Sequence, residues 1–241
     1  MEPILAAVGI HKRFGALVVL DGVDFAVGRG EAVGIVGPNG AGKTTLLNVL
    51  AGSLRPDAGH IELDGADVSR AAAARRCRLG IGRAHQVPRP FGDMTVFENV
   101  FVGAAAGGGG PRSEVYARAI EALDACDLGG LANRRAETLG LLHRKRLELA
   151  RALATSPSVL LLDEVGGGLT DAEADELLAT ITAFRGRGIS VVWIEHIVHV
   201  LVRGVQRLVC MAEGRVIADG EPSAVMSNAQ VIDAYLGRAV A

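Results

Sequence analysis

Residues 37–44 read Gly-Pro-Asn-Gly-Ala-Gly-Lys-Thr and match the pattern G-x-x-x-x-G-K-[ST] at every fixed position. The apolar run 32–36 before them predicts a buried strand, and 45–51 after them predicts a helix that Gly52 can cap. A strand, a glycine loop and a helix in this order present backbone N–H groups and a helix N-terminus to an anion. The sequence therefore predicts a phosphate-binding loop.

The loop contains residues that shape the backbone and residues that act on phosphate. Its glycines let the chain turn with positive φ and approach an anion closely. Lys43 would reach the β- and γ-phosphates of a nucleotide, and the Thr44 hydroxyl would face Mg²⁺. The alternative is a chance glycine turn, against which the flanking strand and helix argue. The predicted nucleotide-binding residues of the loop are Gly37, Pro38, Asn39, Gly40, Ala41, Gly42, Lys43, Thr44 and Thr45.

Length and composition suit a globular α/β protein. The 241 residues suffice for one large domain or a core with a lobe, and 49% hydrophobic residues allow a sizeable core. The net charge of −2 and the scattered arginines give no basic footprint, so no nucleic-acid partner is expected. Cys77, Cys126 and Cys210 are too widely spaced for a metal pair or a disulfide framework, which indicates a reducing cytosol.

The sequence also lacks the usual marks of a membrane-spanning or secreted chain. Its N-terminus carries Glu2 and no basic, apolar signal pattern. No apolar run approaches the roughly 18 residues of a membrane helix. If the protein works at a membrane, a partner must hold it there.

Predicted strands alternate with helices, which implies a mostly parallel sheet covered by helices. A mostly helical stretch, 87–155, interrupts this strand-rich core. The predicted strands are 4–10, 17–27, 32–36, 60–63, 81–86, 159–162 and 190–194, with a hairpin of 207–211 and 215–218. The predicted helices are 45–51, 69–79 (capped by Ser69), 95–103, 113–126, 143–155, 171–187 and 228–236, with capping boxes at Thr95/Glu98 and Thr170/Glu173.

Two carboxylates follow the aliphatic strand 159–162. Ligands bind at the carboxyl ends of parallel strands, so Asp163 and Glu164 are expected to face the phosphate loop. Asp163 is suited to hold Mg²⁺, and Glu164 to orient and deprotonate an attacking water. The alternative is that both carboxylates merely end a strand in solvent.

Three further side chains are candidates on position alone. His196 follows the apolar strand 190–194 and could bond a γ-phosphate, although a single histidine is more often structural. Gln86 also follows a strand, where its amide could sense Mg²⁺ and water. Phe14 could stack on adenine, and core packing is the equal alternative.

Together, these motifs resemble the ATP-binding cassette (ABC) ATPases, the motor subunits of ABC transporters, over essentially the whole chain. The resemblance implies a P-loop NTPase core of ABC type (1–86 and 156–241), with an N-terminal antiparallel β region and an inserted helical subdomain (87–155). It implies ATP and Mg²⁺ as cofactors, with Thr44, Gln86 and Asp163 at the metal. It also implies Phe14 as the adenine-stacking aromatic, Gln86 as the Q-loop glutamine and His196 as the switch histidine, beside Glu164 in catalysis.

Finer segments are similar to one branch, the LivG-like ATPases of branched-chain amino-acid importers. These segments are 82–86, 89–91, 94–100, 146–153, 194–196 and 231–237. Resemblance to this branch implies that the chain energises the import of branched-chain or other amino acids or related small polar solutes. The sequence does not identify the solute. It also implies two transmembrane permeases, a periplasmic solute-binding protein acting indirectly, and a peripheral position on the cytoplasmic face of the inner membrane.

The sequence departs from the family at the signature motif, which aligns with 139–143. Gly140 replaces the family serine and Leu142 the key glycine, and Thr170 stands where relatives carry Asp or Asn. The signature of one subunit completes the site of the other, so we expect a heterodimer with a second ABC ATPase, a homodimer being the alternative. Arg144 or Lys145 could replace the lost contact with positive charge. The alternative functions are a weakly hydrolysing regulatory ABC subunit and a soluble ABC ATPase.

Overall fold

The computed structural model describes residues 2–236 and has a six-stranded sheet at its centre. The strand order is β10-β9-β3-β8-β7-β6, and all neighbours run parallel except β10, which pairs antiparallel with β9. The strands are β3 (Ala32–Val36), β6 (Ile81–Ala84), β7 (Val159–Asp163), β8 (Ser190–Ile194), β9 (Arg207–Ala212) and β10 (Arg215–Gly220).

Both faces of this sheet are buried, because alternate side chains of each strand enter different hydrophobic cores. Leu160, Leu162 and Trp193 belong to the core shared with the covering helices. Leu161 and Ile194 belong to the core shared with β1, β2 and α1 (Lys43–Ala51). Near-continuous aliphatic runs are the sequence signature of such two-sided burial.

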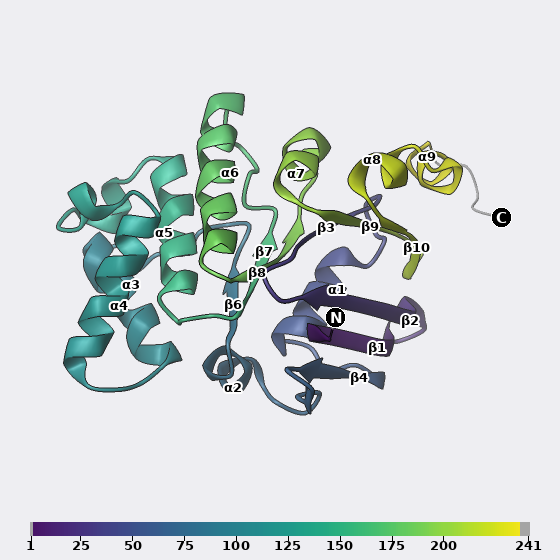
Figure 1. The fold of residues 1–241 in the computed structure, drawn as a ribbon, viewed down its shortest axis with the longest axis horizontal. Coiled ribbons are helices and arrows are strands. Elements are labelled where there is room, and N and C mark those ends of the chain that lie inside the picture. Colours follow the sequence, from purple (N-terminus) through teal and green to yellow (C-terminus); the bar gives the residue numbers. More distant parts are fainter. Residues whose placement is uncertain (1, 237–241) are drawn as a thin grey trace.

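A second, antiparallel sheet has the order β2-β1-β4-β5. Its strands are β1 (Pro3–Phe14), β2 (Leu17–Gly28), β4 (Ala58–Leu63) and β5 (Ala66–Asp67). Gly15 turns with a φ of 60° between β1 and β2. Figure 1 shows this sheet and α1 on one side of the central sheet, with α6 to α9 on the other.

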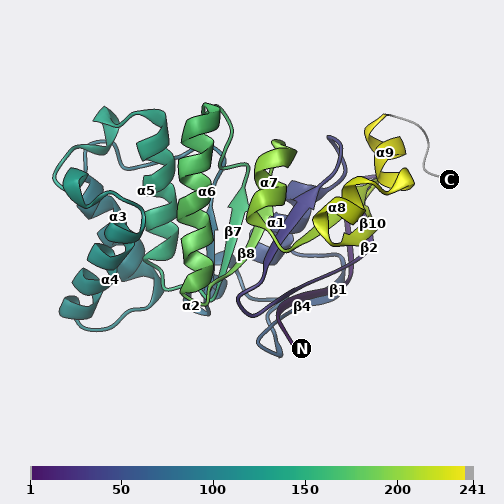
Figure 2. The ribbon, with the colours of Figure 1, turned by 45° about the horizontal axis from the view of Figure 1, so that its top comes forward.

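Helices gather at one end of the molecule, beside β6 in Figure 1 and beside α6 in Figure 2. They are α3 (Val96–Gly107), α4 (Arg112–Ala125) and α5 (Leu141–Leu153), with short 3₁₀ turns at Gly129–Leu131 and Ala136–Thr138. Glycine lets α3 approach α5 closely, since a Cβ on Gly103 would lie 2.5 Å from the Arg151 carbonyl oxygen. The chain reaches these helices after Ala84 and leaves them before Val159.

The remaining helices are α2 (Ala73–Arg78), α6 (Asp171–Gly186), α7 (Val198–Gly204), α8 (Pro222–Met226) and α9 (Ala229–Tyr235). The predicted α/β class is confirmed, and both capping boxes form. The fold of residues 2–236 has no helix of the length and apolar character needed to span a bilayer.

Several predicted boundaries were wrong. The helix expected from Ser69 begins at Ala73, because the Ser69 hydroxyl accepts the Ile61 N–H of β4 instead of capping a helix. Helix α3 continues to Gly107, four residues beyond its expected end at 103. Helix α5 begins at Leu141, two residues before its expected start, and β6 ends at Ala84, two residues before Gln86. Helices α7 and α8 were not predicted. Gly237, the last residue of the resemblance at 231–237, lies outside the described residues.

Candidate nucleotide site

The phosphate-loop backbone adopts conformations that favour glycine. Gly37, Gly40 and Gly42 have φ values of 144°, 83° and 97°. A Cβ on Gly37 would lie 2.0 Å from the Met211 carbonyl oxygen, and one on Gly42 would lie 2.7 Å from that of Val19. The loop is therefore confined by β9 and β2 as well as by its own turns.

Lys43 begins α1 and folds its side chain back over the loop. Its ammonium donates to the carbonyl oxygens of Gly37 at 2.6 Å and Pro38 at 3.0 Å. Burial lowers the pKa of Lys43, and the nearby Glu164 carboxylate opposes that shift. An ammonium has three N–H donors, so one remains for an anion in the loop.

A cavity of about 200 Å³ opens over the loop. Sequence reasoning missed one lining residue, Val19 of β2. Thr44 is exposed and Thr45 is half-buried in this lining. The residues around the cavity are Val19, Asn39, Gly40, Ala41, Gly42, Lys43, Thr44, Thr45, Glu164 and His196.

Glu164 brings the predicted catalytic side chains together. The Gln86 amide Nε2 donates to its Oε2 at 2.5 Å, and His196 Nε2 lies 2.6 Å from its Oε1. Glu164 has a φ of 49°, a conformation that is uncommon for a residue other than glycine. Strained backbone of this kind clusters at functional sites.

Asp163 has a partner that sequence reasoning missed. Its Oδ2 accepts from Arg83 Nη2 at 2.9 Å, and Arg83 Nη1 donates to Asn48 Oδ1 at 2.7 Å. Both side chains of the ion pair are largely buried, at 13% and 10% exposure. A charged residue inside the apolar strand 81–84 was the available signal, because buried arginines need acceptors.

Glu195 is a second acidic group that sequence reasoning missed. It is 3% exposed and accepts the backbone N–H groups of Gly166 and, at 3.2 Å, of His196. Burial raises the pKa of Glu195, and these two N–H groups offset part of that rise. Glu195 thus ties the loop after β7 to the segment that carries His196.

Phe14 does not join the other candidates. It ends β1, is 49% exposed and lies outside the cavity lining. The Lys12 ammonium sits 5.6 Å from the centre of its ring. The geometry therefore leaves a stacking role for Phe14 as a prediction.

The altered signature segment leads directly into α5. Gly140 is the N-cap residue, and it offers no side-chain acceptor to the helix. Arg144 donates to the Leu139 carbonyl oxygen at 2.8 Å, so it stays beside the segment. Lys145 is buried and donates to the Gln86 carbonyl oxygen at 3.3 Å, within its own chain. The expectation that Lys145 could serve a neighbouring subunit is therefore wrong.

Thr170 is used within this chain as well. It caps α6, its hydroxyl accepting the Glu173 N–H at 3.3 Å while the Glu173 carboxylate accepts the Thr170 N–H at 2.9 Å. Asp and Asn cap helices as well as Thr does. The change from the family residue is thus neutral for the start of α6.

Sequence families and known proteins show what this chain is similar to. The family described as "ABC transporter" matches residues 20–166, and the family "Branched-chain amino acid ATP-binding cassette transporter" matches residues 215–241. The high-affinity branched-chain amino acid transport ATP-binding protein BraF of Pseudomonas aeruginosa is 36% identical, covering 99% of both chains. The probable branched-chain amino acid transport ATP-binding protein LivG of Methanocaldococcus jannaschii is 32% identical, covering 97% of both chains.

Solved structures give the same result for the fold. A crystal structure of an ATP-binding cassette of an ABC transporter in its ADP conformation has a TM-score of 0.90 and 31% identity, covering 99% of this chain and 100% of the other. A nucleotide-free ATP-binding cassette has a TM-score of 0.89, covering 97% of this chain and 99% of the other. The loop, the Glu164 contacts and these matches together establish that the chain belongs to the ATP-binding proteins of ABC transporters, which are ATPases coupled to transport.

Proposed function

We propose that the chain binds and hydrolyses ATP to energise an importer of branched-chain amino acids, other amino acids or related small polar solutes. The observation that carries the proposal is the contact of the Glu164 carboxylate with both Gln86 and His196 beside the phosphate loop. The names of BraF and LivG, which match over nearly their full lengths, support the solute class.

The loop residues 37–45 hold the phosphates in this proposal. The N–H groups at the start of α1 and the free donor of Lys43 attract the β- and γ-phosphates. Phe14 stacks on adenine, which requires the exposed turn between β1 and β2 to approach the base.

Thr44, Gln86 and Asp163 would hold Mg²⁺. All three offer oxygen atoms, which this cation prefers, and the Thr44 side chain is exposed beside the loop. When bound, Mg²⁺ neutralises charge on the phosphate oxygens. Arg83 also bonds Asp163, so the carboxylate would share its charge between two cations.

Glu164 would take the proton of the attacking water. One of its oxygens accepts a hydrogen bond from Gln86 and the other lies 2.6 Å from His196 Nε2, and a carboxylate has about four acceptor positions. Capacity for the water therefore remains. In this proposal, His196 and Gln86 orient the carboxylate, and His196 would also bond the γ-phosphate.

We propose the domain division 1–86 with 156–241 as the nucleotide-binding core and 87–155 as the helical subdomain. A groove of about 370 Å³ runs between the two, lined mainly by small and apolar side chains such as Ala74, Cys77, Val102 and Ala106. Such a groove suits a permease segment.

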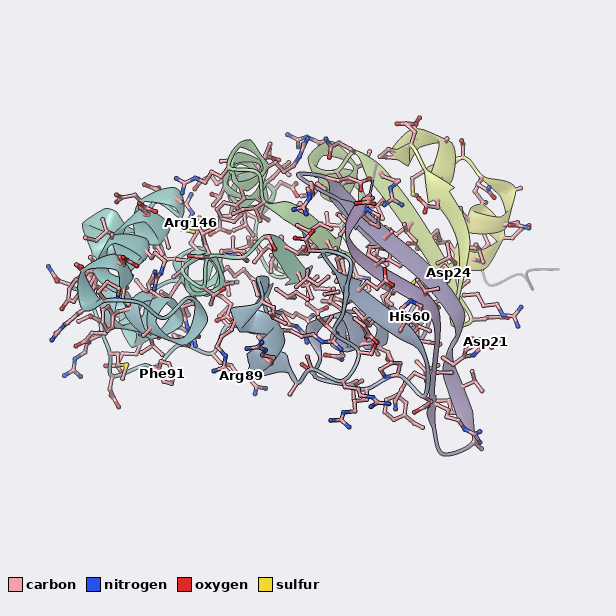
Figure 3. The ribbon with its side chains drawn as sticks, turned by 60° about the horizontal axis from the view of Figure 1, so that its bottom comes forward. Asp21, Asp24, His60, Arg89, Phe91 and Arg146 are labelled. Atoms are coloured by element: carbon pink, nitrogen blue, oxygen red, sulfur yellow. The ribbon has the colours of Figure 1, made fainter. Side chains whose placement is uncertain are left out.

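The rim of this groove offers further contacts. Arg151 donates to the Arg89 carbonyl oxygen at 2.9 Å and lies 5.1 Å from the centre of the Phe91 ring. Figure 3 shows Arg89 and Phe91 on the helical side of the molecule, away from Asp21, Asp24 and His60 on the antiparallel sheet. Docked permeases would hold the chain peripherally on the cytoplasmic face of the inner membrane. A periplasmic binding protein would supply the solute to the permeases without contacting this chain.

The second ATPase of the proposed assembly is a different chain with an unaltered signature. Gly140 would face the nucleotide of that partner and contact it weakly, because no serine hydroxyl is present, while the Leu142 side chain is buried in the core of its own chain. A hydrogen bond to a charged group is worth roughly 1.5–3 kcal/mol, or about ten- to a hundredfold in rate. Gly140→Ser with Leu142→Gly should therefore raise turnover of the assembled complex, and unchanged turnover would contradict this arrangement.

The altered signature also favours a second candidate, a regulatory subunit that hydrolyses little. The Glu164→Gln variant distinguishes the two candidate functions. The change should sharply lower ATP turnover of the complex only if this chain hydrolyses ATP. An equal turnover before and after the change would favour the regulatory role.

The proposal is tested by purifying the Glu164→Gln variant from detergent-solubilised membranes with Mg-ATP. Binding should survive while hydrolysis slows, so two permeases and a second ATPase should co-purify. Recovery of the chain alone would contradict the importer proposal. Gln86→Ala should separate hydrolysis from solute uptake in the same complex, whereas equal loss of ATP binding and uptake would argue against a coupling role.

A further inference from the structure

The first glycine of the phosphate loop is held by a side chain from the far end of the chain. The Gly37 N–H donates to the hydroxyl of Tyr235 at 2.9 Å, across 198 residues of sequence. Tyr235 is the last residue of α9, which packs beside β10 (Figure 1). Val231 of the same helix is fully buried and anchors it.

Gly37 needs this acceptor because it lies just outside the sheet. Strand β3 ends at Val36, whose ladder partner is Cys210, and Gly37 is the next residue. Gly37 is buried, and a buried N–H without a partner is destabilising. The Tyr235 hydroxyl supplies the partner, although the Tyr235 residue as a whole is 44% exposed.

The other side of Gly37 is bonded to the lysine of the loop. The Gly37 carbonyl oxygen accepts from Lys43 Nζ at 2.6 Å. A Cβ on Gly37 would meet the Met211 carbonyl oxygen at 2.0 Å, so the native glycine lies directly against the β9 backbone. Tyr235, Gly37 and Lys43 therefore form one continuous series of hydrogen bonds that ends at the proposed phosphate site.

We propose that Tyr235 is a positioning residue that holds the phosphate loop, through Gly37, in the conformation that binds nucleotide phosphates. The inference rests on the proposed role of residues 37–45 in phosphate binding. Without the hydroxyl, the Gly37 peptide can rotate and take the Lys43 ammonium with it. The binding-competent loop is then only part of the population, and nucleotide affinity falls by that fraction.

The test compares Tyr235→Phe with the unaltered full-length chain. The probe is a non-hydrolysable ATP analogue with Mg²⁺, titrated calorimetrically, together with amide hydrogen exchange at Gly37. We expect the Kd to rise about two- to tenfold, the equivalent of one neutral hydrogen bond, and Gly37 exchange to quicken. The melting temperature without nucleotide should fall by only a few degrees, because one hydrogen bond is lost while the ring still packs.

Two controls separate positioning from general damage. Tyr116→Phe removes the chain's other tyrosine hydroxyl, on α4, and should leave Kd unchanged. Ile232→Ala trims an exposed side chain of α9 and measures what a weakened helix does by itself. A Kd for Tyr235→Phe equal to that of the unaltered chain, or to that of either control, would overturn the inference. Failure of the unaltered chain to bind the analogue would instead contradict the proposed function.

Discussion

His196 Nε2 lies 2.6 Å from Glu164 Oε1, at the ends of two adjacent parallel strands. The register of β7 and β8 pairs Asp163 with Ile194, so the residues beyond each strand emerge at the same edge. His196 is half-exposed and Glu164 is 15% exposed, which places the contact at the cavity wall. This contact fixes the orientation of the Glu164 carboxylate at the cavity wall.

Glu164→Gln is expected to lower ATP hydrolysis by about a hundredfold or more, because loss of a general base costs roughly 10²–10⁴ in rate. Binding of Mg-ATP should persist. Glu213→Gln is the matched control, since Glu213 is exposed in the β9–β10 turn and has the same φ of 49°. Phosphate release by the complex, measured for both variants, checks this. Equal rates in both would show that Glu164 is not the base.

Gly37→Ala is expected to destabilise the chain far more than Gly40→Ala. A Cβ on Gly37 meets the Met211 carbonyl oxygen at 2.0 Å, whereas one on Gly40 meets no atom within 4 Å. Both positions have positive φ, so Gly40→Ala should cost only about 1–2 kcal/mol of backbone strain. In Gly37→Ala, overpacking should add to this strain and lower the free energy of unfolding by about 3 kcal/mol or more. Urea denaturation without nucleotide measures the unfolding free energy of both variants. Similar losses of unfolding free energy would mean that the β9 backbone shifts to accommodate the Cβ at position 37.

Arg83→Met is expected to lower the free energy of unfolding by about 3 kcal/mol, because it leaves the buried Asp163 carboxylate without its cation. The control is Arg203→Met, which removes an exposed pair with Asp175 at 56% and 52% exposure. Exposed pairs contribute about 0–1 kcal/mol. Denaturation curves at neutral pH compare the two. If Arg83→Met lost no more unfolding free energy than Arg203→Met, water would already solvate Asp163 in the native protein.

Glu195→Gln is expected to make the protein more stable than the unaltered chain at neutral pH but not in acid. Burial raises the pKa of Glu195 above 4.5, its value without burial, so the native state binds this proton more tightly than the unfolded state does. The resulting stability is full below pH 4.5 and is lost as the pH rises through the native pKa. Glutamine stays neutral and avoids that loss.

Thermal melting between pH 4 and pH 8 checks this prediction. The difference between Glu195→Gln and the unaltered chain should grow with pH, while the difference for the exposed Glu213→Gln should stay constant. If the melting-temperature difference shrank with rising pH, the Gly166 and His196 N–H groups would lower the pKa of Glu195 by more than burial raises it.

Local patterns predicted much of the fold. The strand, loop and helix around residues 32–52 and both capping boxes occur where the sequence places them. These signals depend on residues within a few positions of one another. The start of α2 was missed because Ser69, a good cap by type, bonds the neighbouring strand. Helices α7 and α8 have seven and five residues, too few for a clear periodic pattern.

The sequence by itself determined the phosphate loop and the polar residues that follow apolar strands. It did so because a helix N-terminus with glycines, or a carboxylate after an aliphatic run, is defined by neighbours along the chain. Only the tertiary structure decided that Glu164 meets both Gln86 and His196, that Arg83 neutralises Asp163, and that Tyr235 holds Gly37. Those contacts join residues 32 to 198 positions apart. They depend on strand order and register, which local residue preferences do not encode.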